Sequence, residues 1–493
     1  MTRVKISKHH AVCALALALA AQPGLAETLE GALVKAYHNN PTLTGARATQ
    51  RAVDEQVAVE LSAGRPQVSA EASLQNRVIR NQPLLTPSRV VTVNGQISVP
   101  VYTGGSVRNS IKAARTRAEG GQDNLRGTEA GVYSEVVAAY MDVIRDSAIV
   151  SFNKQNVSAL KANLRASTQR FKVGDLTRTD VAQSESRLAL AESQLQDAEA
   201  RLIGSKERYV ELVGEAPVAL QKPAPLTGLP ASVEDAVTTA IEKNPDILAA
   251  RKVQAAARFD VRSARGRVAP RVSGVFAASR VDNLNTLSSI AILSGFQNRT
   301  TDAFAGVNVS VPIYQGGLPG ALARQATDRE AAATERTTEV ERGVIAQTRS
   351  AFASWRASLA SIESNRKAVD SAVLSLESVK TENRAGTRTI LDILNAEQEA
   401  LVARTQLASA ERNAFVAAFS LLAAMGQAEA RDLRLPLDRY YDSNAHYRTV
   451  GSRLFDYAFG DIPDPVATRT NMTQPQSADA EADPVGSKPD PRP

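Results

Sequence analysis

Apolar side chains recur every seven residues in the two segments that follow Gly174 and Gly386, and this period predicts two long helices. Each has a main apolar stripe and a second stripe of mostly small residues; the second segment also has a third. Adjoining stripes indicate neighbours on two sides, and alanines permit a close approach. An ordinary antiparallel coiled coil remains an alternative. The stripes are Val181, Leu188, Leu195, Leu202, Tyr209; Ser184, Ala191, Ala198, Ser205, Leu212; Ile393, Ala400, Leu407, Ala414, Leu421; Ala396, Ala403, Ala410, Ala417, Ala424; and Leu394, Leu401, Ala408, Phe415, Leu422.

Each of these helices is preceded by a still longer segment of helix-forming residues. The two segments run from Ser106 to Lys172 and from Leu318 to Arg384, with only Pro319 at the entrance of the second. A helix of this length extends about 100 Å. A globular core does not require such a helix, so the chain is predicted to form long helical hairpins.

The chain is an internal duplication. An offset of 212 relates the second copy to the first over the helical hairpins, while an offset of 204 relates the Asn-Pro pairs upstream. The second copy therefore holds eight extra residues between Ser273 and Val311, as expected of an exposed loop. The matched pairs are Val99 to Gly105 with Val311 to Gly317, Gly174 with Gly386, Asp180 with Asp392, Gly214 with Gly426, and Asn40-Pro41 with Asn244-Pro245.

The segment upstream of each long helix alternates apolar and polar residues and predicts a strand hairpin, at 67–101 and at 271–313. The second is expected to have strands at 271–281 and 301–313 joined by a polar loop. Four strands leave exposed edges, which closure into an oligomeric barrel would remove. Aromatic residues for a membrane girdle are few: Tyr102, Phe276, Phe296, Phe304 and Tyr314. A soluble hairpin capping a helical rod is the alternative.

The helical hairpins are predicted to turn at Gly174 and Gly386, which suit left-handed caps. Thr177 with Asp180, and Thr389 with Asp392, form the pattern of a capping box at the start of the returning helix. Each hairpin tip therefore lies about 100 Å from the strands.

The N-terminus predicts export. Basic residues precede an apolar run, and Gly24-Leu25-Ala26 suits cleavage, so residues 1–26 read as a signal peptide. Cys13, the single cysteine, lies inside this run, which argues against a lipid anchor and against disulfides in the exported chain. The near balance of charge after cleavage argues against a nucleic-acid partner. No later apolar run has the length of a membrane-spanning helix, so a membrane crossing would use strands.

Catalytic and metal-binding patterns are absent from the sequence. His9 and His10 leave with the signal, while His38 and His446 stand apart from other potential ligands. Neither a catalytic triad nor a phosphate-binding glycine loop is visible. We expect no enzymatic activity, no cofactor and no metal.

Several motifs together resemble the TolC family of outer-membrane efflux and secretion channels. They are the signal peptide, the paired Asn-Pro sites, Val99 to Gly105 with its copy, and Ala385 to Glu397. The resemblance covers residues 27 to about 435. It implies a homotrimer in which each protomer gives four strands to a transmembrane β-barrel and helices to a periplasmic tunnel. It also implies an outer-membrane location in contact with lipid, a periplasmic adaptor protein and an inner-membrane transporter of the ABC or RND type.

The resemblance also suggests residues of a gate at the tunnel entrance. Asp392 matches the first aspartate of the family's constriction, Arg388 its gate arginine, and Asp180 an acidic partner in the first copy. Asn395 and Asn383 depart from the family, standing where relatives carry a second aspartate and a gate tyrosine. Three carboxylates at this level, in place of six, would attract cations more weakly. Asp180 and Asp392 are expected to cap helices whether or not they line the gate.

The predicted fold is mainly α with a small β part. The sequence favours an exit duct for type I protein secretion or multidrug efflux, with the missing lipid cysteine and the string Gly386 to Asp392 favouring secretion. A periplasmic adaptor or coiled-coil scaffold without a pore, and a secreted filament, are the alternatives. The predicted divisions are a signal at 1–26, a first repeat at 27–216 with its helical hairpin at 105–213, a linker at 217–231, a second repeat at 232–436 with its helical hairpin at 318–425, and a tail at 437–493 whose last thirty or so residues are expected to be disordered.

Overall fold

The structure is a computed structural model that describes residues 27–82, 84–460 and 464–478. The predicted signal peptide and the end of the tail, from 479, lie outside the described residues. The elements in chain order are α1 (Leu29–Asn39), α2 (Pro41–Ser62), β1 (Gln67–Asn76), β2 (Arg89–Tyr102), α3 (Ser106–Lys172), α4 (Arg178–Val213), α5 (Val233–Lys243), α6 (Pro245–Gly266), β3 (Arg271–Asp282), α7 (Ser289–Leu293), β4 (Arg299–Ser310), α8 (Leu318–Arg384), α9 (Ile390–Ala424), α10 (Ser443–Val450) and the 3₁₀ turn η1 (Thr470–Met472).

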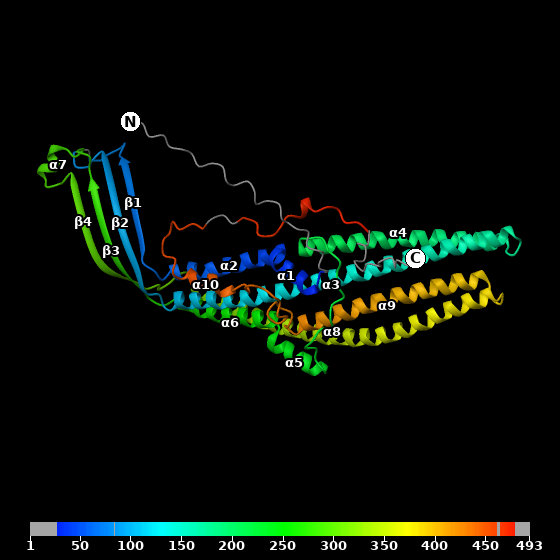
Figure 1. The fold of residues 1–493 in the computed structure, drawn as a ribbon. Helices are drawn as coiled ribbons and strands as arrows, with labels where there is room; N and C mark the ends of the chain where they lie inside the picture. Colours follow the sequence, from blue (N-terminus) through cyan, green and yellow to red (C-terminus); the bar gives the residue numbers. More distant parts are fainter. Residues whose placement is uncertain (1–26, 83, 461–463, 479–493) are drawn as a thin grey trace, which may run out of the picture.

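Two very long helices, α3 and α8, set the dimensions of the molecule, and a four-stranded sheet stands at one end of them (Figure 1). Both helices have 67 residues and begin and end where the sequence predicts. At 1.5 Å per residue each is about 100 Å long. The hairpin tips therefore lie at the end of the molecule opposite the sheet.

Each long helix has two shorter helices as successive partners. Along α3, α4 packs on the half nearest the tip and α2 on the half nearest the sheet; α9 and α6 do the same along α8 (Figure 1). The 36 residues of α4 and the 22 of α2 together nearly match the length of α3. The duplication in sequence is thus a duplication of this packing, and the short helices α1 and α5 that precede α2 and α6 correspond as well.

Two buried asparagines join the shorter helices end to end. The Oδ1 atom of Asn40 accepts the backbone N–H groups at the start of α2, while its Nδ2 donates to the carbonyl of Leu212 at the end of α4 (2.9 Å). Asn244 caps α6 in the same way and donates to the carbonyl of Ala424 in α9 (2.9 Å). Each Asn-Pro pair therefore satisfies orphan groups on two helices at once.

A glycine completes the second of these junctions. Gly426 follows α9 with φ of 70°, and a Cβ there would lie 2.5 Å from the carbonyl oxygen of Lys243. Only glycine combines this left-handed backbone with so close an approach.

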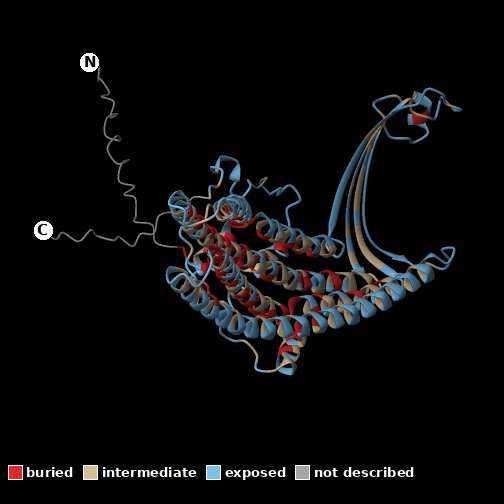
Figure 2. Ribbon diagram, turned by 90° about the vertical axis from the view of Figure 1, so that its right-hand side faces the viewer, coloured by how far each residue is buried: buried red, intermediate tan, exposed pale blue. Residues whose placement is uncertain are grey.

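The sheet is antiparallel in the order β1-β2-β3-β4. All residues of β4 and nearly all of β1 are exposed, because none of the helices that the structure describes covers either face of the sheet (Figure 2). Two details differ from the sequence expectation. β4 ends at Ser310 rather than at 313, and the loop after β3 contains the short helix α7, capped by Ser288.

The main core lies where α1 and the C-terminal ends of α4 and α9 meet α3, near the middle of the rod (Figure 2). Tyr133, Tyr140, Tyr209 and Phe419 are its largest fully buried side chains. Within the described residues no helix combines the length and apolar character needed to cross a bilayer.

The chain after Pro436 folds back along the helical rod. Tyr447 of α10 packs against the apolar face of α2, and residues farther along reach α4, where the backbone N–H of Gln476 donates to Glu207 (2.9 Å). The sequence predicted a disordered end, but residues 464–478 have a defined path, because hydrogen bonds from Gln476 and to Ser477 attach them to α4.

The asparagine junctions generate a stability prediction. Replacing Asn244 by alanine removes the cap of α6 and the donor to a buried carbonyl, so the free energy of unfolding should fall by about 2 kcal/mol. Denaturant unfolding in detergent, followed by circular dichroism, measures the change. Asn365→Ala is the matched control, because Asn365 is partly exposed and its side chain donates to Ser361 within its own helix. Equal losses in the two variants would contradict the junction role.

Candidate functional site

The two hairpin tips have the same backbone design. Gly174 and Gly386 adopt φ of 83° and 82°, as predicted for left-handed caps. After each glycine, a backbone N–H returns to the helix: Asp175 to the carbonyl of Arg170 (2.9 Å), and Thr387 to that of Glu382 (3.0 Å). These bonds satisfy the last carbonyls of α3 and α8, so both tips are defined turns.

The charged side chains of the two tips differ. In the first tip Arg170 pairs with Asp175 (2.6 Å). In the second, Arg388 pairs with Glu382 (2.8 Å), and Asn383 donates to the backbone carbonyl of Arg388 (2.7 Å). The structure therefore brings Arg388 and Asn383 together, and no hydrogen bond or ion pair joins either of them to Asp180 in the described chain.

Asp180 and Asp392 close the capping boxes that the sequence predicts. Each carboxylate accepts the N–H of the threonine three residues earlier at 2.9 Å, and each backbone N–H donates to that threonine's hydroxyl at 3.3 Å. The backbone N–H of Thr177 lowers the pKa of Asp180, and that of Thr389 lowers the pKa of Asp392. Both carboxylates therefore stay ionised at neutral pH, at the tip of each hairpin.

Asn395 does not stand free. Its Oδ1 accepts from Nη2 of Arg187 on α4 (3.0 Å), so the residue links the second helical hairpin to the first. The preceding residue, Leu394, is buried against Val157 and Leu160 of α3. Asn395 and Leu394 thus lie where the second helical hairpin contacts the first.

A buried carboxylate two residues farther along α9 joins three helices. Glu397 is only 6% exposed and accepts from Nδ2 of Asn163 on α3 (3.0 Å), while Nζ of Lys380 on α8 lies 3.7 Å away. Burial raises the pKa of Glu397, and the charge of Lys380 opposes that rise. The carboxylate therefore lies between the two hairpins, close to their tips.

A second connection lies farther from the tips. Arg412 of α9 makes a two-pronged contact with Asp142 of α3, at 2.9 and 3.1 Å. Bidentate pairs of this type fix geometry as well as charge. The inner ends of the hairpins are thus fastened at Arg412, and the outer ends at Arg187 and Glu397.

Sequence reasoning missed the contacts of Arg187, Glu397 and Arg412. Each partner lies more than 200 positions away in the chain. One signal was available in the sequence. Glu397 directly follows Ala396 of an alanine stripe, and a charged residue beside a buried stripe needs a partner. Across the ranges that the structure covers, no three His, Cys, Asp or Glu side chains gather as metal ligands would.

A rod of paired helical hairpins, duplicated within the chain and carrying a four-stranded sheet with open edges, defines a class of outer-membrane channel subunits. The family model described as "Outer membrane efflux protein" matches residues 32–215 and 236–427. The chain belongs to this family of non-enzymatic outer-membrane channels, whose helical part forms a tunnel in the periplasm.

Individual relatives agree. The chain is 34% identical to the outer membrane efflux protein BepC of Brucella suis, over 89% of this chain and 93% of BepC. It is 27% identical to the outer membrane protein TolC of Vibrio cholerae, over 83% of this chain and 92% of that protein. The solved structure of the Campylobacter jejuni CmeC outer membrane channel is similar with a TM-score of 0.72 and 16% identity, covering 86% of this chain and 89% of CmeC. Identity that low supports the fold alone.

The burial of Glu397 predicts a pH-dependent stability. Because its pKa is raised in the folded protein, the folded state favours the protonated form; the stability that this adds is present at acid pH and lost as the pH rises through the folded pKa. Lowering the pH from about 7.5 to about 5 should therefore stabilise the wild type relative to Glu397→Gln. Urea unfolding of both proteins at the two pH values measures this difference.

The control for that comparison is Glu399→Gln, which alters an exposed carboxylate on the same helix. The difference in the free energy of unfolding between this variant and the wild type should be the same at both pH values. If instead the Glu397→Gln variant became less stable relative to the wild type as the pH rises, the charged form of Glu397 would be the stabilising one.

Proposed function

We propose that the protein is the outer-membrane exit duct of an export system and works as a homotrimer. The observation that carries this proposal is the exposure of the second repeat. The structure gives α3 twenty buried residues but α8, of the same length, only four: Val344, Thr348, Ala372 and Leu376. A 67-residue helix with so little cover within its own chain fits an assembly in which neighbouring copies supply the cover.

The sheet supports the same proposal. β1 and β4 are the edge strands, and their unpaired backbone groups would template pairing with another chain. In a bilayer every such group needs a partner, which only a closed sheet provides. Because neighbouring strands in the sheet alternate in direction, β4 of one copy is antiparallel to β1 of the next, as continuous antiparallel pairing requires. Three copies would then form the twelve-stranded barrel that the family resemblance implies, above a common tunnel.

The hairpin tips are the proposed gate. Six similar hairpins, two from each protomer, would surround the periplasmic mouth of the tunnel, with Arg388, Asp180 and Asp392 facing it from the tips. The contacts of Arg187, Glu397 and Arg412 hold the hairpins of one protomer together, which supports movement of each pair as a unit. Opening a mouth that is almost always closed requires about 5.5 kcal/mol of preferential binding to the open form. A periplasmic adaptor and an inner-membrane transporter of the ABC or RND type would supply it.

The proposal names only the class of substrate that is transported. The outer membrane efflux protein of Brucella suis matches along almost its entire length, which supports efflux. The string Gly386 to Asp392 keeps type I protein secretion as the second candidate. In both cases the transporter selects the substrate and the duct conducts it.

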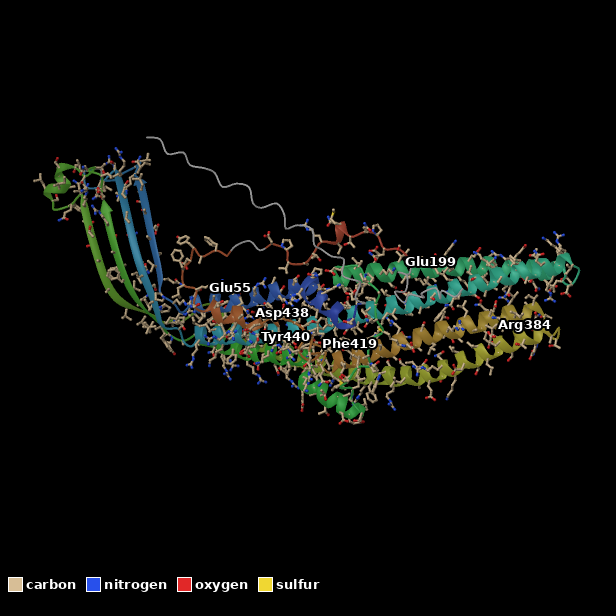
Figure 3. The ribbon with its side chains drawn as sticks, viewed as in Figure 1. Glu55, Glu199, Arg384, Phe419, Asp438 and Tyr440 are labelled. Atoms are coloured by element: carbon tan, nitrogen blue, oxygen red, sulfur yellow. The ribbon has the colours of Figure 1, made fainter. Side chains whose placement is uncertain are left out.

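The gate generates a prediction about conductance. Arg388→Ser combined with Asp180→Ala removes a cation and a carboxylate from the tips, so polar contacts between neighbouring hairpins should weaken and single-channel conductance in planar bilayers should rise several-fold. Arg384→Ser is the matched control, since Arg384 is an exposed arginine at the end of α8 (Figure 3). The same conductance in wild type, control and double variant would contradict the gate role of these residues.

A further inference from the structure

Three aromatic rings of the C-terminal tail project from the surface. Phe455, Tyr457 and Phe459 are 72%, 75% and 82% exposed. Their rings contact in series, with centroids 5.7 Å apart for the first pair and 6.4 Å for the second, both edge to face. The backbone N–H of Ala458 donates to the carbonyl of Phe455 (3.1 Å) and closes a turn beneath them. These three residues form one continuous apolar surface, here named the aromatic tail patch.

The patch is attached to a defined point of the molecule. Nη2 of Arg65 donates to the carbonyl of Gly451 (2.7 Å), and Arg453 pairs with Glu55 of α2 (3.3 Å). Arg65 lies in the short connection between α2 and β1, where the helical rod meets the sheet. Figure 3 shows Glu55 on α2 in this part of the rod, and Figure 1 shows the tail leaving α10 beside it. The patch therefore begins two residues beyond a segment fixed to the rod–sheet boundary.

The sheet carries exposed aromatic rings at the same boundary. Tyr102 ends β2 and Tyr314 follows β4, and both side chains are more than half exposed. Proteins that cross a bilayer as strands place aromatic rings at the level of the lipid headgroups, because the ring is apolar and the tyrosine hydroxyl is polar. Two rings are few for such a girdle. The tail patch offers three more at this end of the molecule.

We propose that the aromatic tail patch inserts into the periplasmic leaflet of the outer membrane, at the boundary between phospholipid headgroups and acyl chains. The proposal rests on the proposed function, because it requires the sheet to cross that membrane. Phe455 and Phe459 enter the acyl boundary, and the hydroxyl of Tyr457 stays at the headgroups. Exposed apolar surface of this kind marks a binding site, and its connection to the sheet selects lipid as the occupant.

Two neighbouring arginines favour an anionic lipid surface, whereas Asp456 lies within the patch between Phe455 and Tyr457. Arg448 and Arg453 precede the patch in the chain, and each side chain is more than half exposed although it pairs with an acidic residue of the protein. Basic side chains next to an apolar patch are attracted to anionic phospholipids. The tail thereby becomes a second membrane contact, separate from the strands.

Tryptophan fluorescence tests the insertion. The chain has a single tryptophan, Trp355 of α8, far from the sheet, so Trp355→Phe gives a background without tryptophan. In this background Tyr457→Trp places the probe in the patch, Tyr314→Trp places it at the end of the sheet, and Leu374→Trp places it on α8 toward the tips. The full-length trimer is reconstituted in phosphatidylethanolamine and phosphatidylglycerol vesicles with and without brominated acyl chains.

Insertion predicts that bromine quenches Tyr457→Trp about as strongly as Tyr314→Trp and leaves Leu374→Trp unchanged. Conductance is recorded from the same preparations. A conducting protein with quenched Tyr314→Trp but unquenched Tyr457→Trp would overturn the tail proposal alone, with the patch then lying on a neighbouring subunit or in water. A protein that neither inserts nor conducts, with no probe quenched, would overturn the proposed function and the tail proposal together.

Discussion

A helix about 100 Å long can persist only if other helices cover its apolar face along its whole length, and this requirement shapes the protein. Neither repeat contains a second helix of that length. Each instead uses two shorter ones placed end to end, and the gap between them is closed by Asn40 or Asn244. The asparagine serves as the N-cap of one helix and donates to one carbonyl in the last turn of the other. Without this double role, the junction would bury unsatisfied backbone groups in the middle of the rod.

The duplicated units have the same outline but different surroundings. The first is central in the protomer, with α3 covered by α2, α4, α6 and α9. The second leaves α8 largely exposed. In the proposed trimer, the exposed face of α8 in one copy would meet the next copy of the ring. The polar contacts of Glu397 and Arg412 tie the two repeats of one chain together, so under the proposed function the contacts that change on opening are those between neighbouring chains.

The helical architecture could be predicted because local signals decide it. Proline-free runs, Gly174 and Gly386, and the capping boxes fixed the ends of α3, α4, α8 and α9. Helix α7 was missed, since five residues hold too few turns for a period to appear. The last strand is shorter than alternation suggests, because its apolar pattern continues past Ser310 beyond the reach of the neighbouring strand.

The candidate site was less predictable. Capping by Asp180 and Asp392 follows from neighbouring residues, whereas the contacts of Asn395 and Glu397 depend on how two hairpins approach each other. Asn395 was placed at the constriction by resemblance, and the structure adds Arg187 as its partner. Arg388 binds Glu382 in the protomer, a local pair that resemblance did not suggest. Contacts between hairpins of different subunits remain part of the proposed function.

The central claim is that exposed α8 and the open sheet edges are surfaces of a trimeric pore. Native mass spectrometry of the wild-type protein in detergent, followed by insertion of the same sample into a planar bilayer, tests it directly. The account predicts a mass of three mature chains, and discrete, small, mostly closed conductance steps. A monomer that never inserts into the bilayer would contradict it and favour a periplasmic adaptor or scaffold.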